Sequence, residues 1–170
     1  MNTLIAYATK YGSVEKCTKT LAEKLMGNVE QYNLAIVKPK DLSGYDNVII
    51  GGSIYAGRIQ KPVTEFCLKN LEVLKQKKIG LFICGMLSDQ AEAELNKAFA
   101  PELLTIAVIK EFFGGELKFQ KINFVERFMV KMVSKMDKSR PAIDTTRDFS
   151  TISEETILRF AQVINETFVN

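Results

Sequence analysis

The sequence predicts an α/β protein in which a parallel sheet carries helices on both faces. Segments of strand length alternate with segments of helical periodicity along most of the chain. The run Asn47–Gly52 is apolar almost without interruption, which is typical of a strand covered on both faces. Three expected strands end in loops of small residues, and in a doubly wound sheet such loops meet at the carboxyl edge, where ligands bind. These loops are Thr9–Val14, Ser53–Arg58 and Gly85–Asp89.

Length and composition favour a single domain spanning residues 1–170. The chain has 170 residues, of which 46% are apolar and 25% charged. No apolar run approaches the roughly 18 residues that a membrane-spanning helix needs. The N-terminus enters a strand directly and shows no signal-peptide pattern, so we expect a cytoplasmic protein.

Cysteine spacing and the lack of histidine argue against a metal site. The three cysteines, Cys17, Cys67 and Cys84, are far apart and form no CxxC pair, and the chain contains no histidine. Cys17 and Cys67 fall on the apolar stripes of expected helices, which predicts that both are core thiols. The absence of histidine also removes the usual general base.

The first loop joins a strand at residues 3–8 to a helix with apolar residues three or four positions apart. Free N–H groups at the positive end of that helix suit an anion. Thr9 and Ser13 add hydroxyls, Lys10 adds charge, and Gly12 permits close approach. The loop has neither a P-loop triphosphate pattern nor a GxGxxG pattern, so it suits one terminal phosphate. The alternative is an ordinary strand-to-helix connection.

The later elements continue the alternation. We expect strands at residues 29–34, 47–52, 78–84 and 106–113, and helices that begin at Pro62, span 90–104 and begin again near Thr151 or Ser153. Gly114 and Gly115 bend the last strand or let another segment approach it. Tyr55, beside a glycine turn, either covers a hydrophobic edge or lies under a planar ligand.

Positive charge is concentrated in one segment. Residues 118–140 carry seven basic and two acidic residues, a net charge of +5, whereas the whole chain carries +3. A helix is expected at 123–136, with Arg127, Lys131 and Lys135 on one line and a Met, Phe and Val face on another. Such a helix lies on an anionic membrane surface or docks on an acidic partner. The alternative is that its apolar face packs on the domain. Nothing else in the sequence supports nucleic-acid binding.

The three loops together resemble those of the flavodoxin-like flavoproteins across essentially the whole chain. Thr9–Ser13 resembles the loop that holds the phosphate of FMN, Gly52–Gly57 the loop that borders the isoalloxazine, and Cys84–Asp89 the third loop. The resemblance implies a three-layer sandwich with a five-stranded parallel sheet in the order 2-1-3-4-5, and FMN as the cofactor. It implies these FMN-binding residues: Thr9, Lys10, Tyr11, Gly12, Ser13, Val14, Ser53, Ile54, Tyr55, Ala56, Gly57, Gly85, Met86, Leu87 and Asp89.

Within that group the sequence is most similar to the menaquinone-dependent protoporphyrinogen dehydrogenase type. The resemblance rests on Gly52, Ser53 and Ile54 ahead of Gly57, and above all on Phe124–Met132. That segment is similar to the basic helix inserted after the fifth strand in those enzymes. The chain departs from the pattern at Val14, which lacks the usual threonine hydroxyl, at Tyr55, one place early, and in the third loop, which has no aromatic residue.

Two functions follow from the resemblance. The first is an FMN oxidoreductase that oxidises protoporphyrinogen and passes electrons to a quinone at the membrane, with no catalytic side chain because the flavin itself accepts the hydride. The second is a soluble electron carrier that docks an acidic redox partner through Arg127, Lys131 and Lys135. A non-enzymatic binding module is the third reading. The resemblance also implies that the backbone near Ala56 and Gly57 lies beside the flavin N5 atom.

Overall fold

The computed structural model describes residues 1–39, 41–86, 88–118 and 148–166. Leu87 and the expected basic helix at 123–136, with Arg127, Lys131 and Lys135, lie outside these residues. No helix within the described ranges combines the length and apolar character that crossing a membrane requires.

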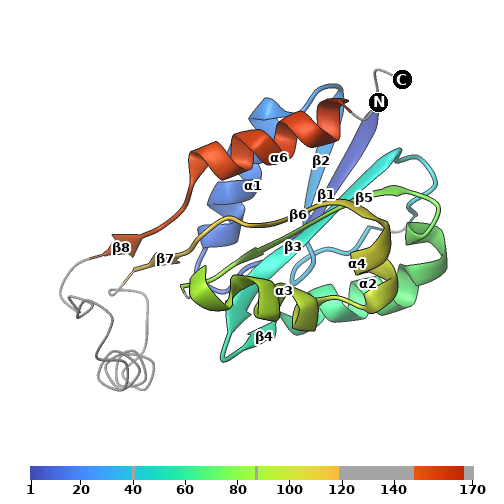
Figure 1. Ribbon diagram of the computed structural model, residues 1–170. Helices are drawn as coiled ribbons and strands as arrows, with labels where there is room; N and C mark the ends of the chain where they lie inside the picture. Colours follow the sequence, from blue (N-terminus) through green and yellow to red (C-terminus); the bar gives the residue numbers. More distant parts are fainter. Residues whose placement is uncertain (40, 87, 119–147, 167–170) are drawn as a thin grey trace.

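Five parallel strands form the centre of the molecule (Figure 1). They are β1 (Asn2–Ala8), β2 (Asn28–Asn33), β3 (Asn47–Tyr55), β5 (Lys78–Cys84) and β6 (Ala107–Phe112). The spatial order is β2-β1-β3-β5-β6, and every neighbouring pair in this path is parallel. Counted along the parallel strands alone, this is the predicted order 2-1-3-4-5, which is therefore confirmed.

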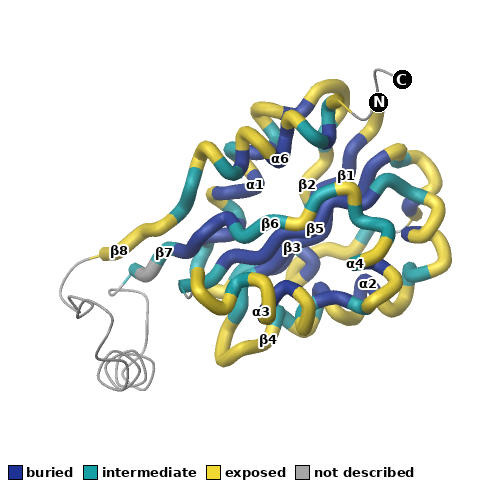
Figure 2. The backbone as a smooth tube through the Cα atoms, viewed as in Figure 1, coloured by how far each residue is buried: buried dark blue, intermediate teal, exposed yellow. Residues whose placement is uncertain are grey.

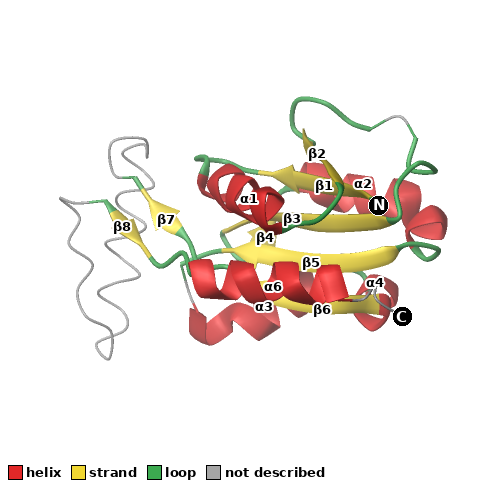
Figure 3. Ribbon diagram, turned by 90° about the horizontal axis from the view of Figure 1, so that it is seen from above, coloured by secondary structure: helices red, strands yellow, loops and turns green. Residues whose placement is uncertain are grey.

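Helices cover both faces of the sheet (Figures 1 and 3). One face carries α1 (Ser13–Lys24) and α6 (Glu154–Glu166), and the other carries α2 (Lys61–Leu74), α3 (Ala91–Ala98) and α4 (Pro101–Ile106). Each face has its own apolar core, and Figure 2 shows the buried central strands between exposed outer helix surfaces. On the α1 and α6 face, the ring of Phe82 stacks on Phe113 at 4.6 Å and meets Phe160 edge-on.

The expected helix at 90–104 is two helices, which corrects that prediction. A short 3₁₀ turn, η1 (Ser88–Gln90), precedes α3, which ends at Ala98, and α4 begins at Pro101. Proline has no N–H to donate and disfavours a helical conformation in the residue before it, and Ala100 is accordingly extended. Pro101 then occupies the first turn of α4, a position where its missing N–H costs nothing.

Residues 53–58, expected as a loop after a strand, form a hairpin instead. Strand β3 continues to Tyr55, and the chain returns as β4 (Arg58–Ile59), antiparallel to β3. The two turn residues both have positive φ, 50° at Ala56 and 71° at Gly57. A two-residue hairpin turn with two positive φ angles matches the twist of its strands.

The predicted close approach at Gly114 and Gly115 is confirmed. A Cβ atom on Gly114 would collide with the carbonyl of Thr151, and one on Gly115 with the carbonyl of Gly85. Beyond them, β7 (Glu116–Leu117) pairs antiparallel with β8 (Phe149–Ser150) and extends away from the main sheet (Figure 3). Leu117 and Phe149 are therefore direct neighbours in this short ladder.

Candidate functional site

The first loop leads from the carboxyl end of β1 into α1, whose first two residues, Ser13 and Val14, are buried. Gly12 is the residue before the helix and has a left-handed conformation, with φ 94°. Its N–H donates to Thr9 Oγ1 at 3.0 Å, which fixes the loop, and no described side chain caps the helix. A Cβ atom at Gly12 would meet nothing within 4 Å, so the space above it is open. The uncapped N–H groups therefore face a space that suits an anion.

Ser53 supplies a buried hydroxyl without a partner. Within the described part of the chain, Ser53 Oγ is buried and makes no hydrogen bond. Gly51, two residues earlier in β3, faces Phe82 in the α1 and α6 core, and strand alternation puts Ser53 on the same face. Its neighbour Gly52 is in register with Ala8, the last residue of β1. Because a buried unsatisfied hydroxyl is costly, this site fits a bound oxyanion such as a phosphate.

Lys10 connects the first loop to the second. Its Nζ atom lies 3.3 Å from the centroid of the Tyr55 ring and 5.2 Å from that of Tyr11. Tyr55, predicted as a platform for a planar ligand, is 38% exposed and carries the Lys10 ammonium over its ring. Such a cation–π contact is worth about 0.5–1 kcal/mol at an exposed site. The two loops that sequence patterns single out are therefore in contact.

The third loop follows β5 and packs closely on its neighbours. The Gly85 N–H donates to the carbonyl of Gly114 at 3.1 Å, and Met86 Sδ lies against Gly115. Asp89 lies in η1. Since β1, β3 and β5 are consecutive in the sheet, the three predicted loops share one edge.

Sequence reasoning missed Glu94 at this edge. It is 8% exposed, and its Oε2 atom is buried with no hydrogen-bond partner in the described ranges. Burial raises the pKa of Glu94, the nearby Asp89 carboxylate raises it further, and Lys97 offsets part of the effect. The sequence contains only a weak indication of this position. Glu94 lies three residues after Ala91 and four before Ala98, so a helix places it on the same face as these two alanines, the inner face of α3.

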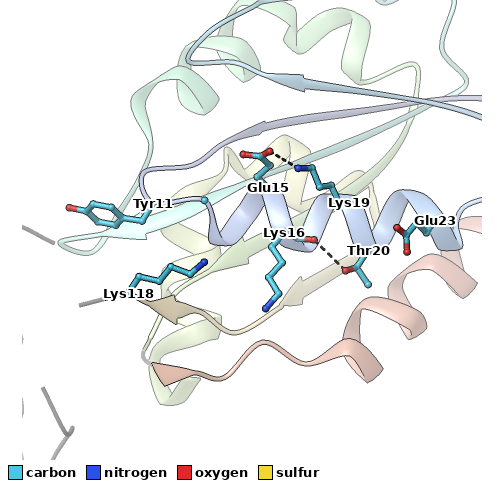
Figure 4. Close-up of a pocket in the computed structure, with 8 residues that line it drawn as sticks. Tyr11, Glu15, Lys16, Lys19, Thr20, Glu23 and Lys118 are labelled. Carbon is cyan, nitrogen blue, oxygen red and sulfur yellow. Dashed lines mark hydrogen bonds and ion pairs between the residues drawn. The ribbon is translucent and has the colours of Figure 1, made fainter. Parts of the chain in front are cut away.

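A hollow in the surface lies along α1 and adjoins the first loop (Figure 4). Its volume is about 410 Å³, and its lining comes from the first loop, α1 and the end of β7: Tyr11, Gly12, Glu15, Lys16, Lys19, Thr20, Glu23 and Lys118. The cations in it are ion-paired, Lys19 with Glu15 at 2.8 Å, and Lys16 and Lys118 with Glu116 at 3.4 and 3.3 Å. With Glu23 counted, Glu15, Glu23 and Glu116 balance the three lysines, so the hollow adds no net charge to the site.

The thiols are structural. Cys17, Cys67 and Cys84 are buried and free, which confirms the two that were predicted as core residues. Burial raises the pKa of Cys67 to about 12, and the pKa of Cys84 is raised first by its hydrogen bond to Cys17, at 3.8 Å, and then by burial. No described group of His, Cys, Asp and Glu residues is arranged to hold a metal ion.

Comparisons with known proteins agree with this architecture. A family model described as the flavodoxin domain matches residues 4–144. The chain is 23% identical to protoporphyrinogen IX dehydrogenase [quinone] of Escherichia coli K12 over 179 aligned positions, which cover 96% of this chain and 94% of that protein.

Solved structures give the same result for the fold. Oxidised flavodoxin 2 from Bacillus cereus superposes with a TM-score of 0.62 at 19% identity, covering 99% of this chain and all of that one. The rubredoxin oxygen:oxidoreductase from Desulfovibrio gigas gives 0.59 at 17% identity, covering 98% of this chain and 35% of that one.

Proposed function

The chain belongs to the flavodoxin domain family, and on that premise we propose that it is an FMN-dependent oxidoreductase that takes electrons from protoporphyrinogen and passes them to a quinone. The single observation that carries the FMN site is the buried, unsatisfied hydroxyl of Ser53 beside the open start of α1. The choice of substrate is supported by the similarity to protoporphyrinogen IX dehydrogenase along nearly the whole of both chains.

The residues present fit FMN. The backbone at Gly12 and Ser13 and the hydroxyls of Thr9 and Ser53 would hold its phosphate, and the second and third loops would border its ring. FMN supplies the electron-accepting chemistry that no side chain of this chain provides. A phosphate on the first loop lies near Lys10, whose positive charge favours an anionic ligand.

The protein's own contribution is binding, orientation and exclusion of water. The hairpin turn at Ala56 and Gly57 has open space beside Gly57, so a planar group can approach its backbone closely. Met86 lies in the third loop, and Ile54 lies beside it. Their apolar side chains make the surroundings of the loop less polar. A ring held there would exchange electrons through its exposed edge.

The basic segment is the proposed contact with the electron acceptor. Its net charge of +5 would draw residues 118–140 toward an anionic membrane surface that contains the quinone. The same charge favours a second candidate function, an electron carrier that docks an acidic protein. Arg127, Lys131 and Lys135 would make the contact in either case.

Oxidation of protoporphyrinogen by the purified, FMN-loaded chain tests the proposal. We expect oxidation that depends on a soluble quinone analogue and exceeds the rate given by the same concentration of free FMN. The exposed Ser43 provides a control, because Ser43→Ala should match the wild-type rate. If the loaded chain oxidises protoporphyrinogen no faster than free FMN does, the dehydrogenase assignment is wrong and the electron carrier takes its place.

A further inference from the structure

Glu94 presents an unsatisfied carboxyl oxygen to the third loop. Its Oε2 atom lies 3.5 Å from the position that a Cβ atom on Gly85 would occupy. Ile54 Cβ and a ring carbon of Phe112 lie 3.6 and 3.4 Å from the same point. The carboxyl group therefore faces backbone and apolar carbon, and no described group gives it a hydrogen bond. A carboxyl group buried in that position costs free energy unless a further group makes a hydrogen bond with it.

This oxygen lies at the edge where the proposed ligand would extend. Neighbouring strands are about 4.8 Å apart, so β5 lies roughly 10 Å from β1 along the edge. A ligand whose phosphate occupies the first loop, and whose ring passes the second, reaches the end of β5 within its own length. Gly85 is the first residue after β5, and Glu94 lies against it.

The surroundings of Glu94 favour its neutral form. Two charged groups act on it: the Asp89 carboxylate in η1, and Lys97 on its own helix. The strands packed against it present Ile54 from β3, Gly85 after β5 and Phe112 from β6, none of which is charged. Desolvation and the Asp89 charge both disfavour ionisation, and the pKa of Glu94 is raised. A neutral carboxyl group, unlike a carboxylate, is a hydrogen-bond donor.

We propose that Glu94, in its protonated form, donates a hydrogen bond to a carbonyl oxygen of the flavin ring and so positions the ring against the third loop. This inference rests on the proposed FMN site. It makes Glu94 a positioning residue that acts on the ring rather than on the phosphate. Flavin affinity then depends on pH: it is constant below the pKa of Glu94 and falls as pH rises above it, by up to tenfold per unit.

Flavin binding to the intact chain, measured between about pH 5 and about pH 8, tests this inference. Riboflavin is the decisive probe because it lacks the phosphate, which itself ionises near pH 6. Glu94→Gln keeps a donor of similar shape at every pH, so it should hold riboflavin with an affinity that does not change with pH. Glu94→Ala should bind riboflavin about 3- to 10-fold more weakly than wild type at low pH. Glu92→Gln, at an exposed position of the same helix, is the matched control and should keep the wild-type pH profile.

The outcomes separate this inference from the proposed function. A wild-type affinity that falls with pH, together with a flat Glu94→Gln profile, supports it. If both flavins bind but wild type and Glu94→Gln share one pH profile, the role of Glu94 is wrong and the FMN site stands. If neither FMN nor riboflavin binds at any pH, the proposed function fails and this inference fails with it.

Discussion

Two side chains at the carboxyl edge of the sheet are buried without partners, and they lie on opposite faces. Ser53 faces the α1 side, and Glu94 packs beneath the third loop from α3. Neither group has a hydrogen-bond partner among the described residues. Side chains of this kind usually have a function outside the fold, because each costs about 1–3 kcal/mol when left unsatisfied.

Replacement of Ser53 should separate ligand binding from stability. Ser53→Ala removes a hydroxyl that the fold leaves unpaired, so the free energy of unfolding without FMN should not fall. FMN affinity should fall about 10- to 100-fold, because a hydrogen bond to a charged group contributes about 1.5–3 kcal/mol. Riboflavin affinity should stay the same. Thermal denaturation measures the first effect and flavin fluorescence titration the second. Ser43→Ala, at an exposed position outside the three loops, is the control for flavin affinity. An equal loss for both flavins would place Ser53 away from the phosphate.

At the scale of elements, the hairpin of β3 and β4 shapes the second loop. Ala56 has a φ of 50°, although it carries a Cβ atom, whereas Gly57, with 71°, carries none. A left-handed conformation costs a non-glycine residue about 1–2 kcal/mol. The turn therefore contains one residue suited to its conformation and one that is strained.

Exchanging the residue types at this turn should change stability in opposite directions. Ala56→Gly relieves the unfavourable φ and should raise the free energy of unfolding, by about 1 kcal/mol at most. Gly57→Ala adds a second strained residue, in open space where no collision contributes, and should lower it by about 1–2 kcal/mol. Urea denaturation of the two variants measures both. The same sign of change for both variants would contradict the hairpin geometry.

How well elements could be predicted depends on whether their signal is local. The strand at 78–84 was predicted with its observed bounds, since its apolar run is continuous and lies between a pair of lysines and a glycine. The helix break was also encoded locally, in Ala100 and Pro101, but apolar periodicity on both sides concealed it. The pairing of β7 with β8 joins Glu116 to Ser150, and no local pattern specifies partners so far apart in the chain. Glu94 was missed because its burial depends on packing against Gly85, which only the tertiary structure establishes.

At the scale of the whole molecule, charge and ligand site are separated along the chain. Residues 118–140 carry a net +5, so the rest of the chain is slightly acidic. The proposed FMN site lies at the ends of β1, β3 and β5, which precede this segment in the chain. We therefore expect replacement of Arg127, Lys131 and Lys135 to leave the proposed flavin site intact, because none of them belongs to its three loops.

Neutralising the basic segment should abolish binding to anionic vesicles and leave FMN affinity unchanged. Each basic residue near such a surface contributes about 1 kcal/mol, so the triple change of Arg127, Lys131 and Lys135 to Gln removes about 3 kcal/mol. Co-sedimentation at low and high salt measures binding, since salt screens the attraction. The matched control replaces three exposed lysines elsewhere by Gln: Lys24, Lys69 and Lys110. Wild-type chain that stays in the supernatant at low salt would contradict membrane contact and favour the protein-docking carrier.

The pairing of β7 with β8 allows the segment between them to be exchanged. Leu117 pairs with Phe149 across it, and Thr151 and Gly115 hold its base by a hydrogen bond of 2.8 Å. The two ends of the stretch between them are thus adjacent, as they are in any hairpin. A two-residue turn can join them in place of 119–147, and a shorter closure loses less entropy on folding. We therefore expect that another segment can be grafted between β7 and β8 without altering the order of the strands.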